Sequence, residues 1–154
     1  MEKHIKDLKK IKDKKRIADT KATLREYGEC LKKIDELRLE IAIKRDSIQG
    51  VGSGLANTNP SKGGGSSQES KICKVMDDIH SREKLIKDIK GEFKDLDWAI
   101  KSLDDPKMIG IVFRIWIHGT STMKLLAVEY GLSKSAMYKK SDLASLRIYK
   151  MIHE

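Results

Sequence analysis

Large apolar residues recur every seven positions through the second half of the chain. The first series is Ile72, Ile79, Ile86, Phe93 and Ile100. A second series fills the complementary heptad positions, with Arg82 as its one exception: Val75, Ile89, Leu96 and Leu103. Spacings that alternate between three and four residues place apolar side chains in one stripe of an α-helix, which a second helix buries in a coiled coil. The repeat therefore predicts one long helix over residues 71–103 that needs a helical partner.

A shorter heptad series lies nearer the N-terminus and consists of Tyr27, Ile34, Leu37 and Ile41. We predict that residues 1–48 form a basic N-terminal helix followed by a first heptad helix. Residues 49–70 are rich in Gly, Ser and Asn, which predicts a flexible loop. The two heptad helices can fold back as an antiparallel hairpin or pair with a second copy of the chain. In either arrangement the buried seam comprises Tyr27, Ile34, Leu37, Ile41, Ile72, Val75, Ile79, Ile86, Ile89, Phe93, Leu96 and Ile100.

The composition suits long helices with much exposed surface. Charged residues make up 36% of the chain and aromatic residues 5%, and only two prolines occur. The 32 Lys and Arg against 23 Asp and Glu give a net charge of +9, concentrated at the two ends of the chain. The basic N-terminal run includes Lys9, Lys10, Lys12, Lys14, Lys15 and Arg16. Such a run attracts phosphate or an acidic protein, or simply keeps an extended helix solvated.

The last fifty residues carry the pattern of a small DNA-binding domain, predicted over residues 105–154. Asp105 and Pro106 suit the start of a helix. An apolar helix then extends to Ile117, and Thr122 is placed to cap the next one. Gly131 supplies a tight turn, and Ser133 caps the helix that follows it. Two short helices joined by a glycine turn are typical of a helix-turn-helix, although any helical hairpin with such a turn has the same pattern.

The second helix of this pattern presents the candidate DNA-binding residues. Its first turns carry Lys134, Ser135, Tyr138 and Lys139, which we predict to face base edges in the major groove. Contacts to the DNA backbone are predicted for Thr122, Lys124 and Lys140. Lys140 falls where many such motifs place an apolar residue, so it leaves the packing of this helix open. For each lysine the alternative is an exposed charge without a ligand.

The sequence contains no recognisable motif for metal binding, cofactor binding or catalysis. The chain has two cysteines and four histidines, without the spacing of metal ligands. We find no catalytic arrangement of Ser, Cys, His or carboxylates, and no phosphate-binding loop. We therefore expect no metal, no cofactor and no enzymatic activity. No apolar run approaches the ~20 residues of a membrane span, and no signal peptide is recognisable, so we expect a cytoplasmic protein without a membrane partner.

The run TMKLLAVEYGLSKSAMYKK, residues 122–140, is similar to the fourth region of bacterial sigma factors. From Tyr27 to Ile152 the chain resembles phage-encoded transcriptional regulators of the ArpU/RinA type. The shared plan comprises a KIDELRLEI-like helix, a Gly/Ser loop, a long helix, a Leu-Asp-Asp-Pro hinge at residues 103–106 and a sigma-like C-terminal domain. The resemblance implies activation of prophage genes, commonly late or packaging functions, in a bacterial host. Sigma-like proteins usually carry more arginine on the second helix, where this chain has lysine, serine and tyrosine.

These observations predict an all-α protein, in which a long coiled-coil hairpin precedes a small helix-turn-helix domain. The expected function is a sequence-specific transcriptional regulator that binds double-stranded DNA. We expect a homo-oligomer, with a dimer favoured, and RNA polymerase as a further candidate partner. One alternative is a DNA-packaging component that resembles a small terminase subunit. Another is a coiled-coil adaptor or anti-repressor that binds protein rather than DNA.

Overall fold

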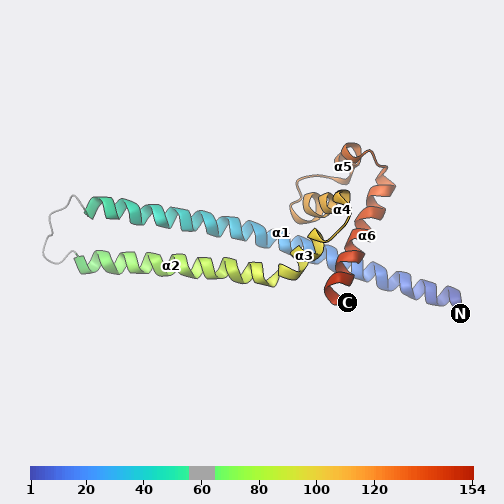
Figure 1. Ribbon diagram of the computed structural model, residues 1–154, viewed down its shortest axis with the longest axis horizontal. Helices are drawn as coiled ribbons and strands as arrows, with labels where there is room; N and C mark the ends of the chain where they lie inside the picture. Colours follow the sequence, from blue (N-terminus) through green and yellow to red (C-terminus); the bar gives the residue numbers. More distant parts are fainter. Residues whose placement is uncertain (56–64) are drawn as a thin grey trace. The chain divides into compact units, whose positions relative to one another are not determined.

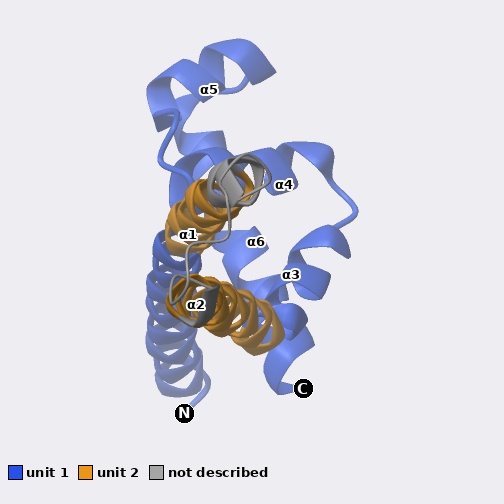
Figure 2. Ribbon diagram, turned by 90° about the vertical axis from the view of Figure 1, so that its left-hand side faces the viewer, with its two compact units in different colours: residues 1–30, 93–154 blue, residues 31–92 orange. Residues whose placement is uncertain are grey.

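The computed structural model describes residues 1–55 and 65–154, and all regular elements in these residues are helical (Figure 1). The prediction of an all-α protein is confirmed. The elements are α1 (Glu2–Leu55), α2 (Gly65–Glu92), α3 (Lys94–Lys101), α4 (Pro106–Ile111), the π-helix η1 (Val112–Ile117), α5 (Met123–Tyr130) and α6 (Lys134–His153). They form two compact units, shown in Figure 2. Unit 1 contains residues 1–30 and 93–154, and unit 2 contains residues 31–92.

The bounds predicted for the loop were wrong at both ends. Helix α1 continues to Leu55 and α2 already begins at Gly65, so parts of the predicted loop 49–70 are helical. Extension of an existing helix adds one hydrogen bond per residue and does not require a new nucleation step. An existing helix can therefore continue into residues of low helix propensity. The rest of the predicted loop, residues 56–64, lies outside the described residues.

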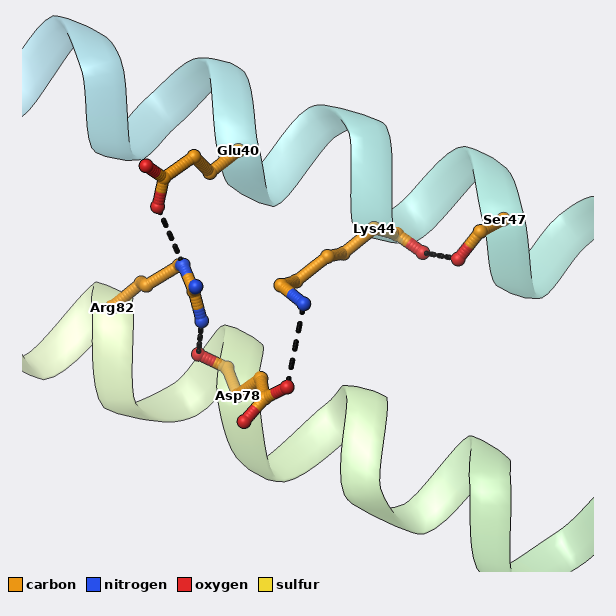
Figure 3. A network of polar contacts seen from close by, with 5 residues as sticks. All are labelled: Glu40, Lys44, Ser47, Asp78 and Arg82. Carbon is orange, nitrogen blue, oxygen red and sulfur yellow. Dashed lines mark hydrogen bonds and ion pairs between the residues drawn. The ribbon is translucent and has the colours of Figure 1, made fainter.

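In unit 2, the second half of α1 and α2 run antiparallel. Glu40 is paired with Arg82 and Lys44 with Asp78, so residue numbers rise along one helix and fall along the other (Figure 3). Of the predicted seam residues in this unit, the buried ones are Ile34, Leu37, Ile41 and Ile79. Another four are half-buried: Ile72, Val75, Ile86 and Ile89. Arg82, which interrupts the apolar series, donates from Nε to Glu40 Oε2 at 2.7 Å.

The prediction of one uninterrupted helix over residues 71–103 was wrong, because the helix is broken at Phe93. Helix α2 ends at Glu92, and Phe93 has φ −100° and ψ 11°. The N–H of Asp97 nevertheless donates to the Phe93 carbonyl at 2.9 Å, so helical hydrogen bonding resumes within one turn. The seven-residue spacing therefore persists across the break. The seam residues beyond it, including Leu96 and Ile100, are buried in unit 1.

Unit 1 is organised around α6, which packs against α3, α4 and α5. Its core includes Ile100, Ile111, Met137, Ala144 and Ile148, all without exposed surface. The first part of α1 contributes a buried face of its own, made of Thr20, Leu24 and Tyr27. The Tyr27 ring lies 5.0 Å from that of Phe93 between centroids. The Thr20 hydroxyl donates to the Arg16 carbonyl at 2.9 Å, which satisfies this buried polar group within the helix.

The segment expected as one helix over residues 106–117 consists of two helical forms. Helix α4 ends at Ile111, and the π-helix η1 follows at once. Val112 and Ile117, five residues apart, are both buried. In an α-helix they would point about 140° apart at ~100° per residue, whereas the i→i+5 repeat of a π-helix brings them to one face. The N–H of His118 donates to the Phe113 carbonyl at 2.8 Å, as this repeat requires.

Gly28 of α1 lies close to the end of η1. A Cβ added to this glycine would overlap the carbonyl group of Ile117, so the glycine permits a close contact between the two helices. Within residues 1–55 and 65–154, no helix combines the length and the apolar character that crossing a membrane requires.

Candidate nucleic-acid interface

Local capping interactions build the α5–turn–α6 segment as the sequence predicts. The Thr122 side chain accepts a hydrogen bond from the Leu125 N–H at 3.3 Å and caps α5. Gly131 ends α5 with φ 66° and ψ 32°, the left-handed conformation that favours glycine. The Ser133 hydroxyl then accepts from the Ala136 N–H at 3.1 Å and caps α6. Three residues, Gly131 to Ser133, therefore separate the two helices.

An apolar cluster fixes α5 and α6 against α4. Its buried members are Ile111, Met123, Leu126, Ala127 and Met137. Leu132 from the turn and Ile115, Trp116 and Tyr130 pack at its edge. Because both helices share this cluster, the exposed residues of α6 are held by a packed scaffold rather than by a loop.

The four predicted base-facing residues lie on the exposed side of α6. The side chains of Lys134, Ser135, Tyr138 and Lys139 are all exposed, whereas Met137 on the opposite side is fully buried. Among the described residues, no hydrogen bond or ion pair involves the ammonium group of Lys134 or Lys139. The structure thus places two positive charges, a hydroxyl and a phenol on adjacent turns at the start of one helix.

The three predicted contacts to the DNA backbone are placed differently from one another. Lys124 is exposed on α5, and Thr122 is exposed but accepts the capping hydrogen bond with its hydroxyl. Lys140 is half-buried and forms an ion pair with Asp105. A charge therefore occupies the expected apolar position because a carboxylate lies opposite it, and α6 continues without interruption from Lys134 to His153.

Asp105 joins two elements at this point. One of its carboxylate oxygens accepts from the Lys107 N–H at 2.9 Å and caps α4, and the other binds the Lys140 ammonium group. The hydrogen bond from Lys140, supported by that from the Lys107 N–H, holds the pKa of Asp105 below its ordinary value of 3.8, against the opposing effect of burial. The capping predicted for Asp105 and Pro106 is confirmed, and the link to α6 is additional.

A polar cluster around Trp116 was not foreseen from the sequence. The indole Nε1 donates to the Ser141 hydroxyl at 2.8 Å, and Ser141 is fully buried on α6. Lys21 Nζ and the Arg25 guanidinium carbon lie over the same indole ring, 4.7 and 5.1 Å from its centroid. Lys21 also pairs with Asp142 at 2.8 Å. The first part of α1 is thereby tied to α6.

The sequence offered one weak signal for this cluster. Ser141 and Ser145 lie four residues apart on the same side of α6 as Met137 and Ile148, where small polar residues interrupt an apolar face. The Ser145 hydroxyl donates to the Ser141 carbonyl at 3.0 Å, as serine commonly does within helices. Nothing in the sequence indicated that Lys21, 121 residues away from Asp142, would complete the arrangement.

Two other basic residues near α5 have structural partners. Arg114 of η1 pairs with Glu129 at 2.8 Å, and Lys107 Nζ donates to the Tyr130 carbonyl at the end of α5 at 3.3 Å. A cation at the C-terminal end of a helix also interacts favourably with the helix dipole. These two charges hold α5 in place, and the exposed cations of α5 and of the first two turns of α6 are Lys124, Lys134 and Lys139.

No family model, no curated protein and no solved structure matches this chain. Within the described ranges, no group of three or more His, Cys, Asp or Glu side chains is arranged to hold a metal ion.

Proposed function

We propose that this protein is a sequence-specific DNA-binding transcriptional regulator, in which α5 and α6 form a helix-turn-helix and α6 enters the major groove. The observation that carries the proposal is the exposed surface of α6 formed by Lys134, Ser135, Tyr138 and Lys139, next to the left-handed turn at Gly131. The resemblance to regulators of the ArpU/RinA type adds phage or prophage genes in a bacterial cytoplasm as the proposed targets.

The chemistry of these side chains suits base edges. A lysine ammonium group at position 134 or 139 can donate to guanine O6 and N7, and the Ser135 hydroxyl can donate or accept at several bases. Tyr138 can contact a thymine methyl group or a phosphate. Because the opposite side of α6 is buried, these contacts would have one fixed register relative to the scaffold.

The residues proposed for the DNA backbone need revision. Lys124 remains suitable, because its side chain is exposed on α5. We propose that Lys140 acts instead as a positioning residue, because its ammonium group binds Asp105 and thereby anchors α6 to the start of α4. Thr122 contributes mainly through its cap on α5.

We further propose that unit 2 is a coiled-coil hairpin through which the protein oligomerises. The antiparallel ion pairs support the hairpin, and the exposed side chains of Leu39 and Ile43 on α1 leave apolar surface for a second copy. A dimer would bring two copies of α6 to one DNA site. Half-sites would then lie about one helical turn apart, ~10–10.5 bp or a multiple of it.

Selection of bound sequences from a random oligonucleotide pool tests the proposal directly. The full-length protein should enrich a defined motif, and Lys134→Ala with Lys139→Ala should lower affinity for that motif by about tenfold or more. The matched control is Lys84→Ala with Lys87→Ala, two exposed lysines of α2. Equal affinity of the double variant and the parent chain would refute the assigned residues, and failure to enrich any motif would refute sequence-specific binding.

A further inference from the structure

The first turns of α1 expose a row of apolar side chains. Ile5, Leu8 and Ile11 lie three residues apart, so they occupy one side of the helix, and 61, 49 and 63% of their surfaces are exposed. Core-forming residues of the same type in unit 1, such as Ile100, are fully buried. An exposed apolar row of this kind on a helix is typical of a surface that binds another molecule.

These residues form the floor of a groove between α1 and the end of α6. This open groove has a volume of about 490 Å³, and its lining residues lie on α1 except for Lys150 of α6. Arg16 closes the junction between the two helices, because its guanidinium carbon lies 5.2 Å from the centroid of the Tyr149 ring. Both walls belong to unit 1.

Positive charge surrounds the apolar floor. The charged residues of the groove are Lys9, Lys12, Arg16, Lys150 and Asp13, which gives four basic against one acidic and a net charge of +3. Asp13 lies 3.9 Å from Arg16, which leaves the lysine side chains to face an incoming ligand. Across residues 1–16 the balance is eight basic to three acidic. A second copy of this surface would bring like charges together, so charge complementarity favours an acidic occupant.

The groove lies at the opposite end of α6 from the proposed DNA-binding residues. Sixteen residues separate Lys134 from Lys150, which corresponds to about 24 Å along a helix. In Figure 1 the C-terminal end of α6 lies beside the first part of α1, away from α5. DNA bound by the first turns of α6 would therefore leave the groove uncovered.

We propose that this groove binds an acidic amphipathic helix of a partner protein. Leucine or isoleucine side chains of the partner would pack on Ile5, Leu8 and Ile11, and its carboxylates would pair with lysines of α1 and with Lys150 of α6. Residues 1–16 contain no Trp or Phe to insert between lipids, which favours a protein partner over a lipid surface. The proposal stands independently of DNA binding, because none of the proposed DNA contacts lines the groove.

Fluorescence anisotropy with the full-length protein provides the test. The probe is a labelled synthetic helix about 18 residues long, with leucine on one face and glutamate on the other. We expect it to bind about tenfold more tightly than the same peptide with glutamine in place of glutamate, and added salt should reduce the difference. Equal binding of the two peptides, or binding of neither, would overturn the proposal.

Variants on each part of the groove separate its contributions. Leu8→Ser with Ile11→Ser removes the floor, and Lys9→Ala with Lys150→Ala removes charge from both walls. All four side chains are exposed, so circular dichroism should show unchanged helix content. Each pair of substitutions should lower the affinity for the acidic peptide about tenfold, whereas Lys84→Ala with Lys87→Ala should leave that affinity unchanged. If the two groove pairs left peptide affinity unchanged, binding would occur elsewhere and the proposal would fail.

Two further measurements distinguish other occupants. Vesicles that contain phosphatidylglycerol should not compete with the peptide, and vesicle binding without peptide binding would assign the surface to a membrane instead. Self-association that disappears with Leu8→Ser and Ile11→Ser would assign it to a second copy. DNA affinity should be the same in both groove pairs and the parent chain, so failure here is separable from failure of the proposed function.

Discussion

Gly28 and Gly91 are both helical glycines, but their surroundings differ. A Cβ at position 28 would overlap the Ile117 carbonyl, whereas one at position 91 would meet nothing within 4 Å. We expect Gly28→Ala to lower the free energy of unfolding by about 1–3 kcal/mol, because the backbone must move apart. Gly91→Ala should raise it by up to about 1 kcal/mol, because alanine favours the helix. Urea denaturation of both variants measures the change in the free energy of unfolding. A change of the same sign in the two variants would contradict the close contact at Gly28.

Asp105 should make the stability of unit 1 depend on pH. Its pKa is lowered in the folded chain, mainly by the hydrogen bond from Lys140. A lowered pKa adds stability that is present above the ordinary carboxyl value and is lost as the pH falls through the folded value. The loss therefore occurs below about pH 4.

Replacement of the carboxylate by an amide tests this dependence. Asp105→Asn keeps a good capping side chain but removes the charge, so the free energy of unfolding should fall at pH 7 and depend less on pH below about 4. Denaturation by urea at several pH values measures both effects. Arg82 lowers the pKa of Glu40 in the same direction, so some acid dependence should remain. Parallel pH curves for parent and variant would show that Asp105 contributes nothing.

Among the helices, η1 and α6 are connected by the hydrogen bond between Trp116 and Ser141. Ser141→Ala leaves the half-buried indole N–H without its acceptor, so we expect a loss of about 1–2 kcal/mol in the free energy of unfolding. Trp116→Phe should then cost less in the Ser141→Ala background than in the parent chain, because the hydrogen bond is already gone. Ser135→Ala, at an exposed position of the same helix, is the matched control and should change little. Additive losses in the double variant would argue against the bond.

At the scale of helices, the sequence predicts the features that depend on residues close together in the chain, such as caps and turns. The caps at Thr122, Ser133 and Asp105 and the turn at Gly131 involve partners within a few positions, so their residue types suffice to predict them. The break at Phe93 was not predictable, because the spacing of apolar residues is the same on both sides of it.

Contacts between distant residues explain the other differences. Lys140 occupies a position where an apolar residue is expected, because its ammonium group pairs with Asp105, 35 residues away in the chain. The switch from α4 to η1 depends on which side chains the surrounding core buries. Val112 and Ile117 are of residue types that do not distinguish a π-helix from an α-helix, so the sequence alone did not predict the switch. The exposed residues of α6 were predictable as a surface, since helical periodicity separates them from Met137.

For the whole molecule, the compact units do not follow the order of the chain. Residues 1–30 belong with residues 93–154, because Lys21 and Arg25 contact Trp116 and Tyr27 contacts Phe93. The predicted segments followed changes in composition along the sequence. Composition located the loop between α1 and α2 only approximately, and it does not reveal that the first part of α1 packs on the last helix.

The proposed oligomer can be tested on the outer surface of unit 2. Leu39 and Ile43 of α1 are 63 and 59% exposed and lie four residues apart, so a second copy could cover both. We expect the parent chain to have the mass of a dimer by light scattering, and Leu39→Glu with Ile43→Glu to shift the mass toward a monomer. Val128→Glu, at a still more exposed apolar position on α5, should leave the mass unchanged. A larger ring would favour the packaging alternative, and an unchanged mass in the double variant would exclude this surface.

The exposed side chains at the start of α6 take no part in the core or in the ion pairs that hold unit 1 together. Surface substitutions of this kind usually change stability by no more than about 0.5 kcal/mol. Mutations at positions 134, 135, 138 and 139 could therefore accumulate in evolution without loss of the fold, and under the proposed function new DNA targets could be acquired one side chain at a time. A library randomised at these four positions should consist largely of folded proteins, which makes the domain a suitable starting point for the selection of altered specificity.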